Sequence, residues 1–311
     1  MDMIKPPRLK AEATIGIISP SYYLESKIYK RTVDIFIQRG FNILKGDSVD
    51  LIENLYSGSP VARAQDIMKM FANPKVDAII CARGGYGANR VLPLLDYDVI
   101  KANPKIFIGY SDITALLTSI TQKTGLVTFH GPMLVTYKNG FIKYNYTNFI
   151  DVLSGKQPLK IEPPNALKSR ILKAGKASGR LWGGNLCLLL NRLGTPDQLQ
   201  TDGAILFIED IGEQHYRFDR MIVQMRNAGM FDKINGLIIG ELVDMQDTDP
   251  PFGKTTDEII MDVCGDLNIP IMTNFPCGHG KYQTTLPLSI NAELDATSSS
   301  PILTILEPPV E

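Results

Sequence analysis

The fold is decided by one stretch of the sequence, Ile106-Phe107-Ile108-Gly109-Tyr110-Ser111-Asp112-Ile113-Thr114. It reads as a buried strand, a tight turn and the start of a helix, with Ser111 at the turn. A serine in this place projects its hydroxyl from the carboxyl end of a sheet, beside backbone N–H groups that stabilise an oxyanion. The stretch lacks the second glycine of Gly-x-Ser-x-Gly, so the alternative that Ser111 merely caps the following helix stays open at this point.

Short apolar runs alternate with helical periodicity on both sides of this stretch. We expect strands at 15–19, 41–44, 76–81, 106–108 and 127–130, and helices at 27–39, 61–72 and 112–121. Strands that alternate with helices in this way indicate a parallel sheet with helices on both faces.

The second half of the chain repeats the alternation after a stretch rich in turn formers. We expect helices at 185–193 and 256–264, strands at 204–208, 237–240 and 271–274, and an antiparallel close at 286–290 and 301–306. The sequence therefore predicts an α/β protein with an N-terminal domain over 1–155, a linker over 156–178 and a C-terminal domain over 179–311.

Composition excludes several classes of protein. The chain has 311 residues, of which 44% are hydrophobic and 21% charged, which suffices for two cores. Its formal net charge of −1 argues against a nucleic-acid binder and against a polybasic membrane anchor. No signal peptide or membrane-spanning run is recognisable, and the 4 cysteines show no paired spacing. We expect a cytoplasmic protein with no cofactor and no metal.

A glycine-rich segment, Arg83-Gly84-Gly85-Tyr86-Gly87, follows the strand expected at 76–81. Glycines in this position let a dinucleotide phosphate approach the backbone, donate N–H groups to a reacting carbonyl oxygen, or simply make a tight turn. The third glycine of a dinucleotide fingerprint is missing, and no acidic residue follows at the spacing that binds a ribose.

Candidates for a general base are limited to three histidines, His130, His215 and His279. His279 lies between two glycines after a strand and is the preferred base, whereas we interpret His130 as structural and His215 as a surface residue near a helix start. A carboxylate that holds an imidazole is available where the strand at 204–208 ends in Glu209-Asp210. The alternative is that these acids only cap the next helix. Without a His-Glu-x-x-His pattern, we predict no metal site.

Taken together, these segments resemble the LD-carboxypeptidase family of serine peptidases, which includes murein tetrapeptide carboxypeptidases and microcin-immunity peptidases. The matching stretches follow one another in order along nearly the whole chain: Gly16–Ser21, Arg83–Gly87, Gly109–Thr114, His130–Pro132, Gly183–Leu186, Leu206–Asp210 and Gly278–Gly280. The resemblance implies a triad of Ser111, Glu209 and His279. It also implies an oxyanion hole formed by the backbone N–H groups of Gly85 and Asp112.

The resemblance further implies a Rossmann-like N-terminal domain with the serine, a mixed α/β C-terminal domain with the glutamate and histidine, and an active site between them, often in a homodimer. The expected reaction is hydrolysis of an L,D-peptide bond through an acyl-enzyme, which releases terminal D-Ala from a murein tetrapeptide during cell-wall recycling. The alternatives are a peptidase of the microcin-immunity type that cleaves an aminoacyl- or peptidyl-nucleotide, and a non-catalytic nucleotide or small-ligand binding protein.

Three residues are predicted to contact the substrate. Arg83 is a candidate partner for a substrate carboxylate, although it can equally be a surface arginine. Trp182, the sole tryptophan, either stacks on the substrate or packs at the domain junction. Asn185 belongs to one of the matching stretches. We predict a small peptide as the partner, with no nucleic acid and no membrane.

Overall fold

A computed structural model describes residues 3–298 and 300–311. The chain divides into two compact units. The first unit contains the chain up to Gln157 together with Thr285–Leu288 and Pro308–Glu311, and the second contains Pro158–Thr284 and Ser289–Glu307. The sequence predicted two consecutive domains, and it did not predict that Thr285–Leu288 and Pro308–Glu311 belong to the first unit.

The first unit is built on a sheet with the strand order β12-β5-β4-β3-β1-β2. Its strands are β1 (Thr14–Ile18), β2 (Asn42–Lys45), β3 (Ala78–Cys81), β4 (Ile106–Gly109), β5 (Phe129–His130) and β12 (Leu286–Pro287). β1 to β5 are parallel, and only β12 runs antiparallel, against β5. The order 2-1-3-4-5 is that of doubly wound, Rossmann-like proteins, in which ligands bind beyond the carboxyl ends of the strands where the order reverses. The predicted parallel sheet is confirmed.

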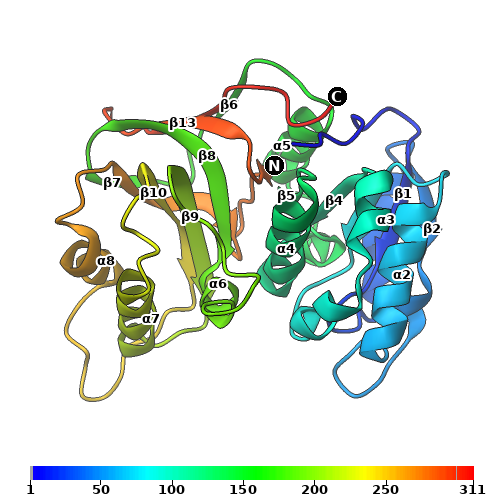
Figure 1. The fold of residues 1–311 in the computed structure, drawn as a ribbon, viewed down its shortest axis with the longest axis horizontal. Coiled ribbons are helices and arrows are strands. Elements are labelled where there is room, and N and C mark those ends of the chain that lie inside the picture. Colours follow the sequence, from blue (N-terminus) through cyan, green and yellow to red (C-terminus); the bar gives the residue numbers. More distant parts are fainter. Residues whose placement is uncertain (1–2, 299) are drawn as a thin grey trace. The chain divides into compact units, whose positions relative to one another are not determined.

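Helices join these strands, as Figure 1 shows for α2, α3 and α4. They are α1 (Ser26–Ile37), α2 (Pro60–Ala72), α3 (Tyr97–Ala102), α4 (Thr114–Thr124) and α5 (Lys143–Leu153). Short 3₁₀ turns lie between them: η1 (Asp47–Asp50), η2 (Ala88–Arg90), η3 (Leu92–Leu94), η4 (Ser111–Ile113) and η5 (Leu134–Tyr137). The connection through α1 leads from β1 to β2 at one edge of the sheet, whereas the connections through α2, α3 and α4 lead away from that edge, toward β5. Because parallel crossovers are right-handed, α1 lies on the other face of the sheet from these three helices.

The second unit contains a mixed sheet with the order β6-β14-β13-β8-β9-β10-β11-β7. Its strands are β6 (Leu159–Ile161), β7 (Arg170–Lys173), β8 (Lys176–Asn185), β9 (Ala204–Ile211), β10 (Gly236–Val243), β11 (Ile271–Gly278), β13 (Asn291–Asp295) and β14 (Ile302–Ile305). The four central strands β8 to β11 are parallel, so their carboxyl ends lie at one edge of the sheet. The outer strands pair antiparallel, which confirms the mixed α/β prediction.

Residues 156–178, which the sequence suggested to be a linker, instead supply β6, β7 and the first part of β8. β6 and β7 are the two edge strands of the sheet. Edge strands are typically short, polar and bounded by turn formers, because they are paired on one side only. Their sequence therefore looks like a connection rather than like a buried strand.

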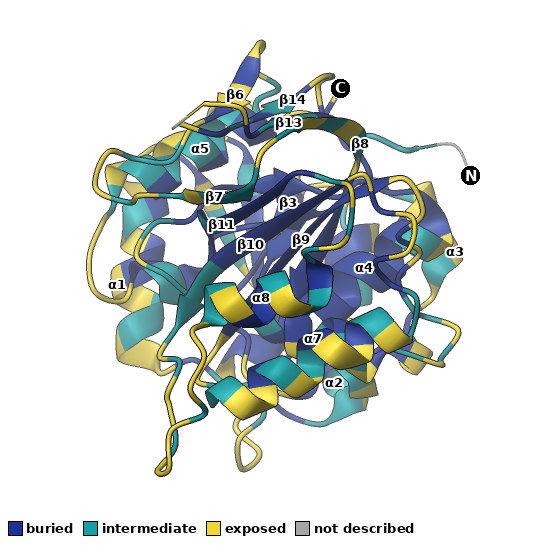
Figure 2. Ribbon diagram, turned by 90° about the vertical axis from the view of Figure 1, so that its left-hand side faces the viewer, coloured by how far each residue is buried: buried dark blue, intermediate teal, exposed yellow. Residues whose placement is uncertain are grey.

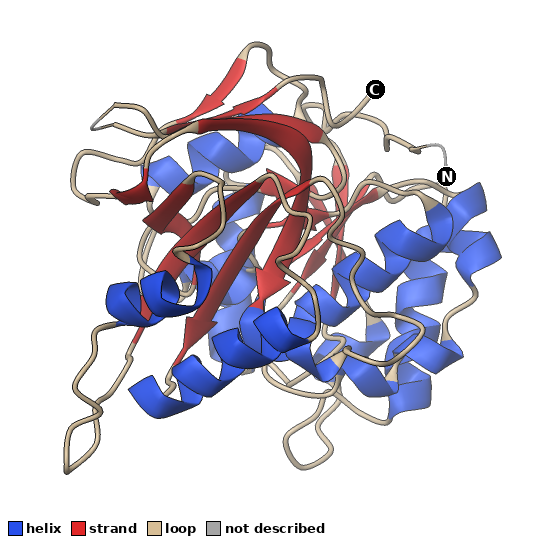
Figure 3. Ribbon diagram, turned by 60° about the vertical axis from the view of Figure 1, so that its left-hand side comes forward, coloured by secondary structure: helices blue, strands red, loops and turns tan. Residues whose placement is uncertain are grey.

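The helices of the second unit are α6 (Leu186–Asn191), α7 (His215–Asn227) and α8 (Thr256–Cys264). Figure 2 shows exposed residues on the outer faces of α7 and α8 and buried residues along β9, β10 and β11. Figure 3 colours the helices blue and the strands red. The start of α8 is fixed by a capping box between Thr255 and Glu258. Within residues 3–298 and 300–311, no helix has the length and apolar character needed to cross a membrane.

Candidate active site

Ser111 occupies a strained turn at the carboxyl end of β4. Its φ of +63° lies in the left-handed region, which non-glycine residues rarely adopt. Gly109 makes this turn possible, because a Cβ there would lie 2.7 Å from Cγ2 of Ile113. The cap position of α4 is held by Ile113, and Ser111 is instead the first residue of the 3₁₀ turn η4, whose own cap position is held by Tyr110. The alternative that Ser111 caps the following helix is therefore wrong.

The glycine loop after β3 lies directly against this turn. A Cβ on Gly84 would be 3.0 Å from Ser111 Cβ, 3.2 Å from Ser111 Oγ and 3.3 Å from the backbone nitrogen of Asp112. Gly85, the next residue, is exposed and has a φ of +120°. The two predicted oxyanion donors, the N–H groups of Gly85 and Asp112, thus belong to two segments in contact beside the serine. Their role as oxyanion donors stays a prediction.

In the second unit, Glu209 and His279 form a buried pair at the carboxyl ends of β9 and β11. His279 Nδ1 lies 2.7 Å from Glu209 Oε2, with the Glu209 side chain 0% and the His279 side chain 14% exposed. A carboxylate on Nδ1 fixes the imidazole tautomer that presents Nε2 as a base. The structure therefore brings together the two residues that the sequence suggested as base and carboxylate.

The two glycines that flank His279 are required by the carboxylates around it. A Cβ on Gly278 would lie 2.3 Å from Glu209 Oε2, and a Cβ on Gly280 would lie 2.0 Å from Glu241 Oε1. Glu241 stands on β10, opposite Gly278 of β11. The Gly-His-Gly pattern is thus a consequence of side chains that fill the space beside the backbone.

Three acids lie near the turn that carries His279, and two of them shift its pKa. Burial alone would lower the pKa of His279, but the charge and hydrogen bond of Glu209, with the charge of Asp210, raise it above its usual value. Burial, and then the charge of Glu209, raise the pKa of Asp210 to about 6. Burial raises the pKa of Glu241 to about 7, against the opposing effect of the N–H group of Tyr282. Glu241 was not predicted from the sequence, in which its only signal is its place near the end of a buried strand.

The two halves of the chain each match a family description. Residues 15–131 match the LD-carboxypeptidase N-terminal domain, and residues 178–294 match the LD-carboxypeptidase C-terminal domain. The chain belongs to the LD-carboxypeptidase family. The predicted assignment to this family of serine-type hydrolases is confirmed.

Curated relatives agree with this membership over nearly the full length of the chain. The probable murein peptide carboxypeptidase of Bacillus subtilis is 30% identical, and the match covers 96% of this chain and 94% of the relative. The microcin C7 self-immunity protein MccF of Escherichia coli is 33% identical over 91% of this chain and 90% of its own.

Solved structures extend the similarity to the fold. MccF in complex with glutamyl sulfamoyl guanosine superposes with a TM-score of 0.90, at 28% identity and 99% coverage of both chains. A muramoyltetrapeptide carboxypeptidase from Oxalobacter formigenes gives a TM-score of 0.85, at 29% identity, covering 94% of this chain and 98% of that one.

The residues predicted to contact the substrate of this LD-carboxypeptidase family member have defined places. Arg83 follows β3, with its guanidinium 5.6 Å from the ring centre of Tyr22 and 3.4 Å from the carbonyl oxygen of Tyr23. Trp182 lies within β8 and is 8% exposed. Asn185 caps α6 by accepting the N–H of Leu188 at 3.2 Å. Their contact with a substrate stays a prediction.

The remaining histidines also have clear surroundings. His130 is buried in β5, with its ring centre 6.1 Å from that of Tyr110. His215 begins α7, where Nδ1 lies 3.9 Å from Asp247. No group of His, Cys, Asp and Glu in the described part of the chain is arranged to hold a metal ion.

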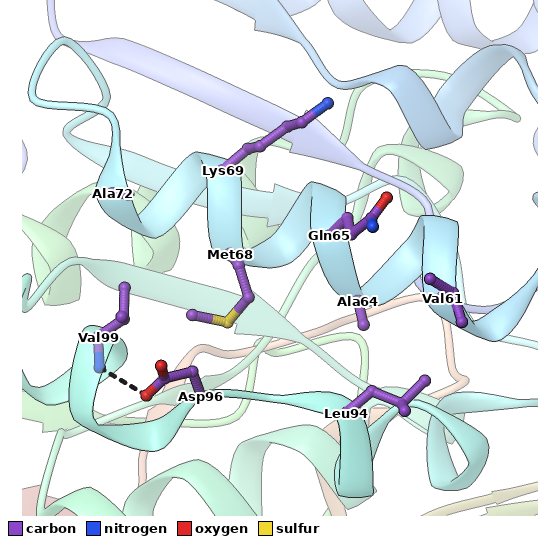
Figure 4. Close-up of a pocket in the computed structure, with 9 residues that line it drawn as sticks. All are labelled: Val61, Ala64, Gln65, Met68, Lys69, Ala72, Leu94, Asp96 and Val99. Atoms are coloured by element: carbon purple, nitrogen blue, oxygen red, sulfur yellow. Dashed lines mark hydrogen bonds between the residues drawn. The ribbon is translucent and has the colours of Figure 1, made fainter.

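A groove of about 760 Å³ lies elsewhere on the first unit, between α2 and the η3–α3 segment (Figure 4). Met68, Leu94 and Val99 are among its apolar walls, and none of the predicted site residues lines it. The groove is therefore not part of the candidate active site.

Proposed function

We propose that this protein is a serine carboxypeptidase that hydrolyses an L,D-peptide bond and releases terminal D-Ala from a murein tetrapeptide. The observation that carries the proposal is the 2.7 Å contact between His279 Nδ1 and Glu209 Oε2 in a chain whose Ser111 has a φ of +63°. Names of relatives support the substrate: one is a probable murein peptide carboxypeptidase and another a muramoyltetrapeptide carboxypeptidase.

In the proposed mechanism, Ser111 Oγ attacks the carbonyl carbon of the scissile bond while His279 takes its proton. The N–H groups of Gly85 and Asp112 bind the oxyanion, and each such donor typically lowers the barrier by about 3 kcal/mol. His279 then gives the proton to the departing amino group, and the C–N bond breaks to leave an acyl-enzyme on Ser111. Water, deprotonated by His279, cleaves this ester and restores the serine.

Glu209 holds the imidazole and stabilises its charged form without taking its proton. Its effect on the pKa of His279 has a consequence for activity. His279 must be neutral to accept the serine proton, and its pKa is raised. We therefore expect kcat/KM to rise with pH through a value above the ordinary imidazole pKa of about 6.5.

A second candidate substrate is an aminoacyl- or peptidyl-nucleotide. The similar structure of MccF holds glutamyl sulfamoyl guanosine, and MccF is a self-immunity protein against microcin C7. The chemistry at Ser111 would be the same for both substrates. Turnover of a murein tetrapeptide and of an aminoacyl-sulfamoyl-adenosine, compared under the same conditions, separates the two.

The proposal is tested by labelling and by substitution. We expect a serine-directed fluorophosphonate to modify Ser111, and we expect Ser111→Ala and His279→Ala to reduce turnover of the tetrapeptide to a similar floor, because triad members act as a unit. His215→Ala is the control, since His215 lies at the start of α7. Retained turnover in His279→Ala would contradict the mechanism. Tight nucleotide binding with an unlabelled Ser111 would instead favour a non-catalytic binding protein.

The setting of the reaction also stays a prediction. Cell-wall recycling in the cytoplasm by a homodimer is what the family resemblance suggests. Cell fractionation and light scattering of the purified protein test the location and the assembly.

A further inference from the structure

The carboxylate of Asp112 is buried and connects two loops of the first unit. Asp112 is 2% exposed, and its Oδ2 accepts hydrogen bonds from Ser21 Oγ at 2.5 Å and from the backbone nitrogen of Ala88 at 2.8 Å. The N–H of Gly87 also donates to this carboxylate. Ser21 lies in the loop after β1, whereas Gly87 ends the glycine loop after β3 and Ala88 begins η2.

A buried arginine holds the same two loops. Arg63 of α2 is 1% exposed, and its Nη1 donates to the carbonyl oxygens of Pro20 at 2.6 Å and Gly87 at 3.1 Å. Its Nε donates to the carbonyl oxygen of Gly58 at 3.2 Å. Burial raises the pKa of Asp112, and the hydrogen bonds from Ser21 and the backbone, with the charge of Arg63, oppose this. The loops after β1 and β3 are thus held by the carboxyl group of Asp112 and the guanidinium of Arg63 in the same network.

The glycine loop needs such a restraint. Gly85 and Gly87 both have φ near +120°, a region open to glycine, and glycine is also the residue with the most backbone freedom to lose. Asp112 supplies an N–H beside Ser111 through its backbone and fixes the loop that carries the Gly85 N–H through its side chain. The two oxyanion donors are therefore linked through a single residue.

We propose that the Asp112 carboxylate, supported by Ser21 and Arg63, is the positioning group that sets the oxyanion hole of this enzyme. It acts through the N–H groups of Gly85 and Asp112 and does not itself touch the substrate. The inference rests on the proposed function, in which Ser111 is the nucleophile. Because a displacement of a catalytic group by about 1 Å can cost about 100-fold in rate, loss of this restraint should be visible in the chemical step.

The test compares Asp112→Asn and Ser21→Ala with a matched control in the same unit. Ser48, like Ser21, is a buried serine whose Oγ donates to a buried aspartate, in this case Asp66 of α2. Ser48→Ala therefore removes a comparable Ser–Asp hydrogen bond, together with the bond that Ser48 Oγ accepts from the N–H of Ser19 in the loop after β1. The hydrogen bonds of Ser48 reach neither the glycine loop nor the Ser111 turn, so this variant perturbs the loop after β1 without removing the link through Asp112.

We expect Asp112→Asn to lower kcat about 100-fold and Ser21→Ala about 10-fold, with KM changed less than threefold, since an oxyanion hole acts mainly in the transition state. The rate of labelling by a fluorophosphonate should fall in parallel, and Ser48→Ala should change neither quantity. Ser21→Ala keeps both charges and provides the test if Asp112→Asn does not fold.

Two outcomes would overturn the inference. In one, Ser21→Ala and Asp112→Asn keep wild-type kcat while Ser111→Ala is inactive, so that the proposed function stands and the positioning role fails. In the other, Ser48→Ala and Ser21→Ala have the same melting temperature and lose the same amount of kcat. The loss would then follow from lower stability and not from the link through Asp112. If Ser111→Ala retains full turnover, the proposed function itself fails, which is a distinct result.

Discussion

Replacement of Gly278 by alanine should break the Glu209–His279 pair without touching either side chain. The new Cβ would lie 2.3 Å from Glu209 Oε2, whereas ordinary van der Waals contact begins at 3.4 Å, so the carboxylate must move by about 1.1 Å. If this movement also points away from His279, the distance from Oε2 to His279 Nδ1 would grow from 2.7 Å to at most about 3.8 Å, beyond hydrogen-bond distance.

The cost has two parts that a control separates. Gly278 has a φ of +96°, and an alanine in the left-handed region costs about 1–2 kcal/mol of stability. Weakening the buried pair adds a further cost, whose upper limit is the loss of about 3–5 kcal/mol when one partner of a buried pair is removed altogether. Gly203, also in the second unit, has a φ of +71° and nothing within 4 Å of its ideal Cβ position. Gly203→Ala therefore reports the backbone cost alone.

Urea denaturation and NMR titration of His279 measure the two effects. In the wild type the folded pKa of His279 is raised, so protonation stabilises the fold below the ordinary pKa, and this contribution is lost as pH rises through the folded value. In Gly278→Ala, burial dominates and the pKa should fall below its ordinary value, which reverses that pH dependence. Turnover should drop about 10⁴-fold, as expected when a base loses its orienting carboxylate. The reasoning would be refuted if the pKa of His279 stayed raised in Gly278→Ala and if Gly278→Ala were as stable as Gly203→Ala.

Three further outcomes are expected. The contribution of Glu241 to stability should fall by about 1–2 kcal/mol between pH 4.5 and 7, because its folded pKa is about 7 and partial exposure screens its effect. Urea titrations of Glu241→Gln should show a flatter pH profile than the wild type, and an unchanged slope would exclude Glu241 as a cause. Ser111→Gly should abolish turnover, yet it should be more stable than Ser111→Ala by about 1 kcal/mol and melt at a higher temperature, because glycine tolerates the φ of +63°. Equal melting temperatures of the two variants would argue against strain at the turn. In the native protein Ellman's reagent should react quickly with the exposed Cys187 and slowly with the three buried cysteines, and fast reaction of more than one thiol per chain would contradict the described burial.

Much of the first sheet was predictable, because fully buried parallel strands are continuous apolar runs such as Ile79–Cys81 and Ile106–Ile108. α5 was missed, since it starts at Lys143 without a side-chain cap and is rich in aromatic and β-branched residues of modest helix propensity. α3, with only 6 residues, is too short to show a period.

The candidate site was predictable where the backbone itself demands a residue type. Gly109 and Gly278 are visible in the sequence because a side chain at either position would collide with its surroundings. Arg63 was not predictable, because an arginine on a helix looks the same in sequence whether it faces water or is 1% exposed. Glu241 escaped for a similar reason: its carboxyl is recognisable as buried only once β11 is placed beside β10.

The path of the chain through the two units has a consequence for synthesis. β5 is paired along its outer edge by β12, with Leu286 opposite His130, and Glu311 exchanges backbone hydrogen bonds with Arg8 and Pro6. A nascent chain that has just emerged past residue 157 therefore holds the serine but lacks these closing contacts. The unit that bears Ser111 can be completed only after residues 285–311 leave the ribosome, by which time His279 has been made. The last contacts of the first unit thus form only when the proposed nucleophile and its proposed base are both already in the chain.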